Sequence, residues 1–420
     1  MDFNSSSPFP EGVISFLDTD LYKLTMQCAV FKYFKDVQLG NISLSDEEFR
    51  FLKTHCDYLT DDYVRFLKDF RLRPREQAVA TFHPVGADTG AESDSDIGEL
   101  HVEIKGAWLD TILYEIPLLA LTSEAYFRFM DTDWTYDGQE DQAFAKGMRL
   151  LDAGCTFSEF GTRRRRDYHT QALVFRGLVK ASKEAEKQGL KGKLTGTSNW
   201  FMGIAAIHDD YKAATELALR YWVGCFGGKL GIALTDTFGT QEFLRAFSQP
   251  VRPVDGDGND TSFKTPDGSR PLTYAELFQG VRQDSGDPAD YVKMLRQYYD
   301  SQGIKDKKTM VFSDSLNIER CLEYKAISEE AGFTPTFGVG TFLTNDFTHL
   351  KTGTKSVPLN IVIKLSSANG RPAIKISDNI GKNTGDKETV NKVKSQLGYV
   401  EKEWTGGDET QRWGKDEDKA

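Results

Sequence analysis

From about residue 155 onward, short apolar runs alternate with longer amphipathic stretches along the chain. The runs have the length of strands, and the stretches that follow them carry apolar residues at helical spacing. The successive pairs are 230–236 with 240–247, 280–284 with 287–299, and 310–314 with 316–331. This alternation predicts repeated β–α units, which build a parallel sheet or a (β/α) barrel with its functional groups at the carboxyl ends of the strands.

The first part of the chain has a different pattern. Residues 45–70 predict two helices, and residues 77–82 and 99–106 alternate in the manner of strands. The apolar stretch 108–129 predicts one long helix with a kink at Pro117, because proline cannot donate the helical hydrogen bond.

Three further stretches lie outside both patterns. Residues 17–34 predict a helix that interleaves apolar side chains with lysines. Residues 250–271 are rich in glycine and aspartate and predict a long exposed insert. The tail from residue 401 is highly charged and is expected to fray.

The composition excludes several classes of protein. Of 420 residues, 39% are hydrophobic and 12% aromatic, which suffices for a large core and excludes wholesale disorder. Acidic residues number 63 and basic residues 52, so the net charge of −11 argues against a global basic surface for nucleic acid or membranes. No apolar run approaches the roughly 18 residues of a membrane helix.

The cysteines and the first residues bear on the compartment. The five cysteines form no Cys-x-x-Cys pair, so neither a disulfide framework nor a four-cysteine zinc site is expected. Residues 1–12 lack the basic and apolar regions of a signal peptide. We therefore expect a cytoplasmic protein, with the nucleus as a second location.

Four consecutive arginines, residues 163–166, follow Phe160 and Gly161 at the end of a strand-like run. Guanidinium groups offer forked donors that suit phosphate or carboxylate, and an aromatic ring beside them can stack on a planar anionic ligand. Four neighbouring arginines cannot all face one ligand, so a solvated basic face is the alternative interpretation.

Two other strand ends carry candidate groups. Arg282 and Asp284 are two residues apart and should point the same way, while Asp287 before a proline predicts the start of a helix. Gly338 and Gly340 would let a phosphate approach the backbone closely, although a structural turn explains them equally well. The turn 196–199, Gly-Thr-Ser-Asn, is a weaker signal of the same kind.

Several catalytic classes are disfavoured by missing motifs. The six histidines form neither an i,i+4 pair nor His-Glu-x-x-His, which argues against a zinc hydrolase. No Gly-x-Ser-x-Gly is present, and the glycines near residue 340 lack the lysine of a phosphate-binding P-loop.

Taken together, these segments resemble the nicotinate phosphoribosyltransferase family, from Asp18 to about Trp413. The matching segments are 18–26, 113–119, 158–165, 196–199, 234–239, 281–288, 313–317 and 337–341. The resemblance implies an α/β fold of the type II phosphoribosyltransferase kind, an irregular (β/α) barrel plus an α/β sandwich domain. Residues 1–154 would form most of the sandwich and connecting helices, 155–358 the barrel with the active site, and 359–420 a segment that returns to the sandwich before a loose tail.

The implied reaction joins nicotinate to phosphoribosyl pyrophosphate and releases nicotinate mononucleotide and pyrophosphate. ATP as a co-substrate would be hydrolysed with it, Mg²⁺ would be the cofactor, and the product would enter NAD biosynthesis by salvage. The resemblance further implies a homodimer with its active sites at the subunit boundary, and no nucleic-acid or membrane partner.

The resemblance also assigns the groups that bind the base. Phe160 and Arg282 would sandwich the pyridine ring, and Tyr22 of the partner subunit would close the pocket. Arg163 would meet either the ring carboxylate or a phosphate. Relatives that use nicotinamide carry an acidic residue at the position of Ser198, which accepts from the amide, whereas a neutral hydroxyl can donate to nicotinate. A mismatched polar group costs about 1–3 kcal/mol, so the chain is expected to use the acid.

The remaining assignments concern the sugar and phosphates. Carboxylates near the ribose favour the cationic transition state that forms when pyrophosphate leaves. The resemblance implies that Asp236 and Asp284 face the ribose and the Mg-pyrophosphate and that Asp314 supports the same region. The groups expected to cradle the 5′-phosphate are Gly338, Gly340 and Thr341.

The chain departs from the family pattern in two places. After Asn199 the family has a stretch that carries the histidine phosphorylated by ATP, and here that stretch is missing, so no phosphorylated histidine is identifiable. A strand that follows the first helix in the family is also missing, after Val37. A catalytically impaired homologue that binds ligand or pairs with a full-length subunit is therefore the main alternative, and a nicotinamide-using enzyme is the other.

Overall fold

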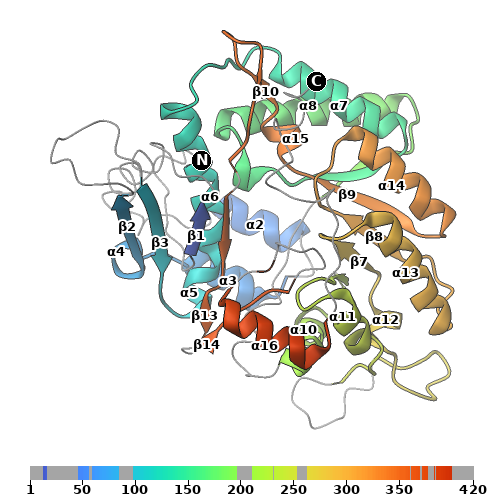
Figure 1. The fold of residues 1–420 in the computed structure, drawn as a ribbon. Helices are drawn as coiled ribbons and strands as arrows, with labels where there is room; N and C mark the ends of the chain where they lie inside the picture. The colour runs from blue at the N-terminus through green and yellow to red at the C-terminus, as the bar shows by residue number, and fades with distance from the viewer. Residues whose placement is uncertain are drawn as a thin grey trace.

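The fold is α/β and centres on a parallel sheet of six strands (Figure 1). The computed structural model describes residues 13–16, 46–55, 59–84, 98–195, 211–229, 231–252, 263–359, 361–368, 371–376, 383 and 385–399. The strand order is β5 (Lys193–Leu194), β4 (Thr156–Glu159), β9 (Thr334–Val339), β8 (Thr309–Phe312), β7 (Gly280–Gln283) and β6 (Ile232–Leu234). All five pairings are parallel, which confirms the expected class.

Helices alternate with these strands along the chain, as the periodicity predicts. They are α7 (Gln139–Asp152), α8 (Tyr168–Lys187), α10 (Tyr211–Phe226), α11 (Thr240–Phe247), α12 (Tyr274–Leu277), α13 (Pro288–Ser301), α14 (Ile318–Glu330) and α15 (Thr341–Thr344). Their apolar faces and the strands enclose the largest core cluster, in which Phe157, Phe312 and Phe337 are fully buried. Helix α13 begins as expected, because Asp287 accepts a hydrogen bond from the amide of Asp290 at 2.9 Å and Pro288 opens the first turn.

A second group of elements combines the two ends of the chain. Strand β1 (Val13–Phe16) pairs antiparallel with β12 (Ile361–Lys364), and β2 (Ala78–Pro84) pairs antiparallel with β3 (Gly98–Ile104). A separate apolar cluster lies here and includes Val102, Leu118 and Ile361. The other elements are α2 (Asp46–His55), α3 (Asp61–Asp69), α4 (Pro74–Gln77), β10 (Phe347–Thr348), β11 (Lys355–Ser356), β13 (Ser367–Ala368), β14 (Arg371–Pro372) and α16 (Lys387–Leu397).

The prediction of a single long helix over 108–129 is wrong in one respect. The chain forms α5 (Trp108–Thr111), a 3-10 turn η3 (Ile112–Tyr114) and α6 (Glu115–Phe129), so the break precedes Pro117. Pro117 lies in the first turn of α6, where a missing N–H removes no helical hydrogen bond, so a kink at the proline is not needed. No helix among these described residues is long and apolar enough to cross a membrane.

The described end of the expected insert is an ordered turn. Lys264 bridges Pro271, Pro250 bridges Thr273, and Phe263 packs against the main core. Residues 253–262 lie outside the described part, as do the expected helix 17–34 and the tail from residue 401.

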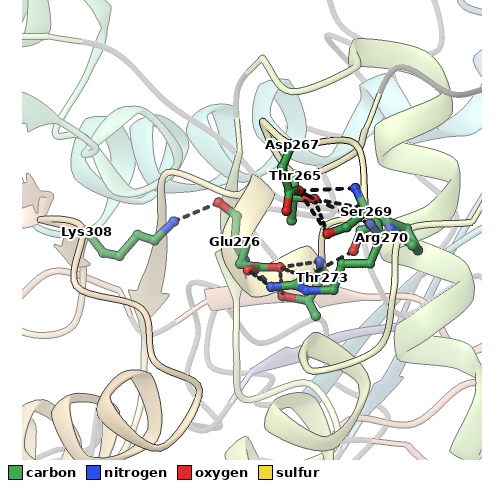
Figure 2. A network of polar contacts seen from close by, with 8 residues as sticks. Thr265, Asp267, Ser269, Arg270, Thr273, Glu276 and Lys308 are labelled. Atoms are coloured by element: carbon green, nitrogen blue, oxygen red, sulfur yellow. Dashed lines mark hydrogen bonds and ion pairs between the residues drawn. The ribbon is translucent and has the colours of Figure 1, made fainter.

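A polar network closes this turn, and Figure 2 shows it from close by. Glu276 accepts from both terminal nitrogens of Arg270, at 2.8 and 2.6 Å, and from the amide of Thr273 at 2.8 Å. Lys308 donates to the carbonyl oxygens of Glu276 and Phe278, both at 2.9 Å. We call this set the Glu276 network: Thr265, Asp267, Ser269, Arg270, Thr273, Glu276 and Lys308.

Candidate active site

The candidate residues gather where the carboxyl ends of neighbouring parallel strands meet. Arg282, on β7, donates from Nε to Ser313 Oγ at 2.8 Å and from Nη2 to Asp284 Oδ1 at 3.1 Å. The hydroxyl of Ser313, just beyond β8, donates in turn to Asp284 Oδ1 at 2.7 Å. The expectation that Arg282 and Asp284 point the same way is therefore confirmed.

Asp236, two residues beyond β6, belongs to the same edge of the sheet. Its side chain is almost fully buried, and Oδ2 accepts from Ser285 Oγ at 2.6 Å and from Lys375 Nζ at 2.9 Å. Asp314 is also buried, immediately after Ser313. We call Asp236, Arg282, Asp284, Ser313 and Lys375 the strand-end network.

Lys375 is the residue that the sequence analysis missed. The amide of Ile376 donates to the carbonyl of Thr237 at 2.8 Å, and Ile376 bridges Phe238, so the C-terminal segment docks beside β6 and carries Lys375 to Asp236. Ala373, Lys375 and Ile376 are all buried. A lysine inside a short apolar run was the available signal, because a buried ammonium requires a partner.

The charges of the strand-end network are coupled. Burial acts to lower the pKa of Lys375, but the negative charges of Asp236 and Asp284 and the hydrogen bond that Lys375 donates to Asp236 outweigh it, so the pKa lies above its ordinary value. Two carboxylates and two cations thus balance one another at this edge. An anionic ligand would therefore need further positive charge from elsewhere.

Phe160 lies on the far side of this edge, beyond β4. Its ring packs on Gly338 of β9 so closely that a Cβ on that glycine would come within 2.5 Å of the ring. The guanidinium carbon of Arg282 lies 5.8 Å from the centroid of the same ring. A planar ligand between them needs about 3.5 Å on each side, so a side-chain shift of about 1 Å would admit it.

The four consecutive arginines point in different directions. Arg165 donates to Gln171 Oε1 at 2.8 Å, and Arg166 donates to Ser356 Oγ at 2.7 Å with its guanidinium carbon 3.7 Å from the centre of the Phe127 ring. Both are fully buried, so a solvated basic face is wrong for these two.

The other two arginines lie in the 3-10 turn η4 (Thr162–Arg164) and are partly exposed. Arg164 donates from Nε to the carbonyl of Ile361 at 3.2 Å, which ties it to β12. Arg163 has no hydrogen bond or ion pair with any residue that the structure describes. Among the described contacts of the four arginines, those of Arg163 include no partner, so its guanidinium is available to a ligand.

The glycine segment after β9 forms the neighbouring wall. Gly340 precedes the short helix α15, and a Cβ on Gly340 would come no closer than 3.7 Å to its nearest neighbour, the carbonyl oxygen of Phe160. Gly340 and Thr341 are partly exposed. The structure thus brings Phe160, Arg282 and Gly338 into one place, with Gly340 beside them, whereas Tyr22 and Ser198 lie outside the described residues.

Within the described ranges, no group of three histidine, cysteine or acidic residues could hold a metal ion by itself. The carboxylates at the strand ends instead face Arg282 and Lys375. The fold is α/β, and the candidate residues gather at the carboxyl ends of parallel strands, which is where such folds commonly bind their ligands.

Comparison with known proteins identifies the family. The model of the nicotinate phosphoribosyltransferase N-terminal domain matches residues 37–123, and the model of the nicotinate phosphoribosyltransferase family matches residues 155–401. The chain belongs to the nicotinate phosphoribosyltransferase family.

Similar proteins agree over nearly the whole chain. A nicotinate phosphoribosyltransferase of Saccharomyces cerevisiae is 40% identical over 450 residues, with 95% of this chain and 98% of the relative covered. A probable nicotinate phosphoribosyltransferase of Schizosaccharomyces pombe is 40% identical, with 92% and 98% covered. The crystal structure of a putative nicotinate phosphoribosyltransferase from Saccharomyces cerevisiae has a TM-score of 0.74 at 39% identity and covers 94% of this chain and 100% of that one.

A solved structure from Porphyromonas gingivalis, also described as a nicotinate phosphoribosyltransferase, has a TM-score of 0.67 at 28% identity, with 91% and 99% covered. The match to the Saccharomyces cerevisiae relative is longer than the 420 residues of this chain, so its alignment contains gaps in this chain.

Proposed function

We propose that this chain forms nicotinate mononucleotide and pyrophosphate from nicotinate and phosphoribosyl pyrophosphate, as a step of NAD salvage. The observation that carries the proposal is the approach of Arg282 to the Phe160 ring, 5.8 Å from guanidinium carbon to centroid. A flat aromatic acid fits between a ring and a guanidinium, since both stack on planar groups.

The other groups have roles that follow from their positions. Arg163 would pair with the carboxylate of the acid, which fixes the ring in its plane and aims its nitrogen at the anomeric carbon. Asp236 and Asp284 would face the ribose, where their negative charge favours the cationic state that develops as pyrophosphate leaves. Gly340 and Thr341 would receive the 5′-phosphate, because both are partly exposed and Gly340 has no side chain to keep a phosphate from its backbone.

Magnesium is part of the proposal. Mg²⁺ commonly binds through substrate phosphates and one or two carboxylates, and Asp236 and Asp284 are the side chains that could contact it here. When bound, it would offset the charge of the leaving pyrophosphate. The charges of the strand-end network already balance one another, so a bound pyrophosphate would need an added cation, which supports a role for Mg²⁺.

We include ATP coupling, a homodimer and a cytoplasmic location in the proposal, all from the family resemblance and the sequence. The chain lacks the segment that carries the phosphorylated histidine in the family. A comparison of nucleotide formation with and without ATP therefore tests whether ATP coupling needs that segment. Stimulation by ATP supports coupling in this chain, whereas ATP-independent turnover assigns coupling to the missing segment.

The test uses the purified full chain with nicotinate, phosphoribosyl pyrophosphate and Mg²⁺, with and without ATP, and follows the nucleotide by chromatography. We expect nicotinate mononucleotide, and more of it than nicotinamide mononucleotide when both bases compete. Absence of any nucleotide, together with thermal stabilisation by nicotinate, would replace the proposal by the binding-only homologue.

Base choice has its own variant. Ser198→Asp should shift the preference from nicotinate toward nicotinamide by roughly ten- to a hundredfold, because a carboxylate repels the acid and accepts from the amide. An unchanged ratio of kcat/KM for the two bases would remove Ser198 from the specificity assignment.

A further inference from the structure

Glu159, the last residue of β4, is a partly buried acid that the proposed reaction does not use. Both of its carboxylate oxygens accept hydrogen bonds: Oε1 from the amide of Gly161, and Oε2 from Gln171 Nε2 at 3.0 Å. One oxygen thus holds the turn directly after the strand, and the other reaches helix α8.

Gln171 extends this contact to the rest of the arginine loop, which we define as residues 160–166. Its Nε2 also donates to Thr162 Oγ1 at 2.8 Å, and its Oε1 accepts from Arg165 Nη1 at 2.8 Å. Gln171 and Arg165 are buried, so the network lies inside the protein. Glu159 and Gln171 together bind three residues of the loop: Gly161, Thr162 and Arg165.

The opposite side of the arginine loop is attached to the segment that ends α15. Thr344 Oγ1 donates to the carbonyl of Gly161 at 3.1 Å, and Asn345 Nδ2 donates to the carbonyl of Arg164 at 2.8 Å. A Cβ on Gly161 would overlap Thr344 Oγ1 and lie 2.8 Å from Glu159 Oε1. The peptide around Gly161 is therefore fixed from both sides.

The hydrogen bonds of Glu159 offset the unfavourable burial of its carboxylate. Burial raises the pKa of Glu159, while the hydrogen bonds from Gln171 and Gly161 and the charge of Arg165 act against that rise. A buried carboxylate is unfavourable unless it is hydrogen-bonded, and here both oxygens are. Phe160 follows this residue directly, and Arg163 lies in the turn that Glu159 and Gln171 hold.

We propose that Glu159 is a positioning residue for recognition of the substrate carboxylate. It fixes the arginine loop so that Phe160 and Arg163 are presented to the acid, while Arg165 is held inside the protein by Gln171. Glu159 does not touch the ligand. The inference rests on the proposed function, because it takes nicotinate as the ligand of Phe160 and Arg163.

The first variant is Glu159→Gln. Its amide group would face either the Gly161 N–H or Gln171 Nε2, so that one donor opposes another and the loop loses a contact. We expect the KM for nicotinate to rise by about tenfold to a hundredfold, because a displacement of about 1 Å at a binding group has effects of this size. The kcat and the KM for phosphoribosyl pyrophosphate should change by less than about threefold.

A second change should restore the network. In Glu159→Gln with Gln171→Glu, the new amide can accept from Gly161 and donate to the new carboxylate, which in turn accepts from Arg165 and Thr162. The KM for nicotinate should return to within about threefold of that of the starting chain. A purely structural role would show only a lower unfolding midpoint and no such recovery of KM.

Glu140→Gln is the matched control. Glu140 binds Arg176 and Lys180 of α8 and forms no hydrogen bond or ion pair with the described residues of the arginine loop, so its loss should leave both KM values unchanged. An equal rise of the nicotinate KM in Glu140→Gln and Glu159→Gln, or a double variant that does not recover, would overturn the proposal.

Hydrogen exchange of peptides from 160–166 tests the ordering of the loop without turnover. We expect faster exchange in Glu159→Gln than in the starting chain and in Glu140→Gln. Faster exchange in a chain that makes no nucleotide would show that the loop is ordered as proposed and that the proposed function has failed. Unchanged exchange in a chain that does make nucleotide would reject the positioning role alone.

Discussion

The Glu276 network and the strand-end network contain the same chemical groups but connect different parts of the chain. In each, a carboxylate accepts from a guanidinium, and a lysine is nearby. The Glu276 network draws all members but Lys308 from residues 265–276. The strand-end network instead takes its members from the ends of three strands and from the C-terminal segment.

The two networks also differ in what their loss would leave behind. The side chain of Arg270 is 53% exposed, so water can replace its bonds to Glu276. The side chains of Asp236 and Lys375 are 2% and 11% exposed, so neither can turn to water when its partner is removed. A network formed within one turn stabilises that turn, whereas a network assembled from distant segments fixes charges at one edge of the sheet.

Replacing the arginine of each network by lysine should give the largest difference between them, and the quantity that differs is kcat/KM for nicotinate. Arg282→Lys should lower kcat/KM for nicotinate by at least about a hundredfold, since lysine cannot bond Ser313 and Asp284 together or stack flat on a ring. Arg270→Lys should leave kcat/KM unchanged. Steady-state kinetics on both variants make the test, and similar activities would mean that Arg282 serves the fold alone.

The two lysines provide the next test. Lys375→Met leaves Asp236 buried without its cation and should lower the free energy of unfolding by about 3–5 kcal/mol. Lys308→Met leaves two carbonyl groups unbonded and should cost about 1–3 kcal/mol, with activity retained in the folded protein. Urea denaturation measures both costs.

Adding Asp236→Asn to Lys375→Met separates stability from chemistry. The buried charge is then gone, so most of the lost stability should return, while formation of the nucleotide stays below about one hundredth of the original rate. Recovery of the rate along with the stability would contradict the role of Asp236 at the ribose.

The sequence predicted the features that depend on near neighbours. The alternation of apolar runs placed the strands and helices of the sheet, and Asp287 with Pro288 placed the start of α13. The spacing of Arg282 and Asp284 predicted their shared direction, because side chains two apart on a strand lie on one face.

Features set by distant segments could not be predicted in the same way. Lys375 reaches Asp236 only because Ile376 docks beside the segment after β6. The burial of Arg166 depends on Phe127 and Phe347, one far before it and one far after it in the sequence. Such positions have no periodic signal, so their environment follows only from the assembled fold.

A smaller effect is expected from two glycines of the site. In Gly338→Ala the new methyl group would displace the Phe160 ring, so the KM for nicotinate should rise about tenfold. In Gly340→Ala the methyl group makes only ordinary van der Waals contact, at 3.7 Å from the carbonyl oxygen of Phe160, so any rise in the KM for phosphoribosyl pyrophosphate would report a phosphate that approaches this backbone. Comparison of the four KM values decides the assignment, and it fails if both variants raise the KM of the same substrate.

The smallest effect concerns the Glu276 network and should be visible only in stability. The bonds from Arg270 lower the pKa of Glu276 to about 2, with those from Thr273 in support and burial acting against them. A lowered pKa in the folded chain means that Glu276 stabilises the fold above its ordinary pKa of 4.5 and loses that effect as the pH falls toward 2. Glu276→Gln should therefore reduce the free energy of unfolding by about 1–2 kcal/mol at pH 7, after allowance for solvent screening. Below pH 4.5 the difference from the unsubstituted chain should shrink steadily, whereas a difference that is constant with pH would show that the network acts through packing and not through charge.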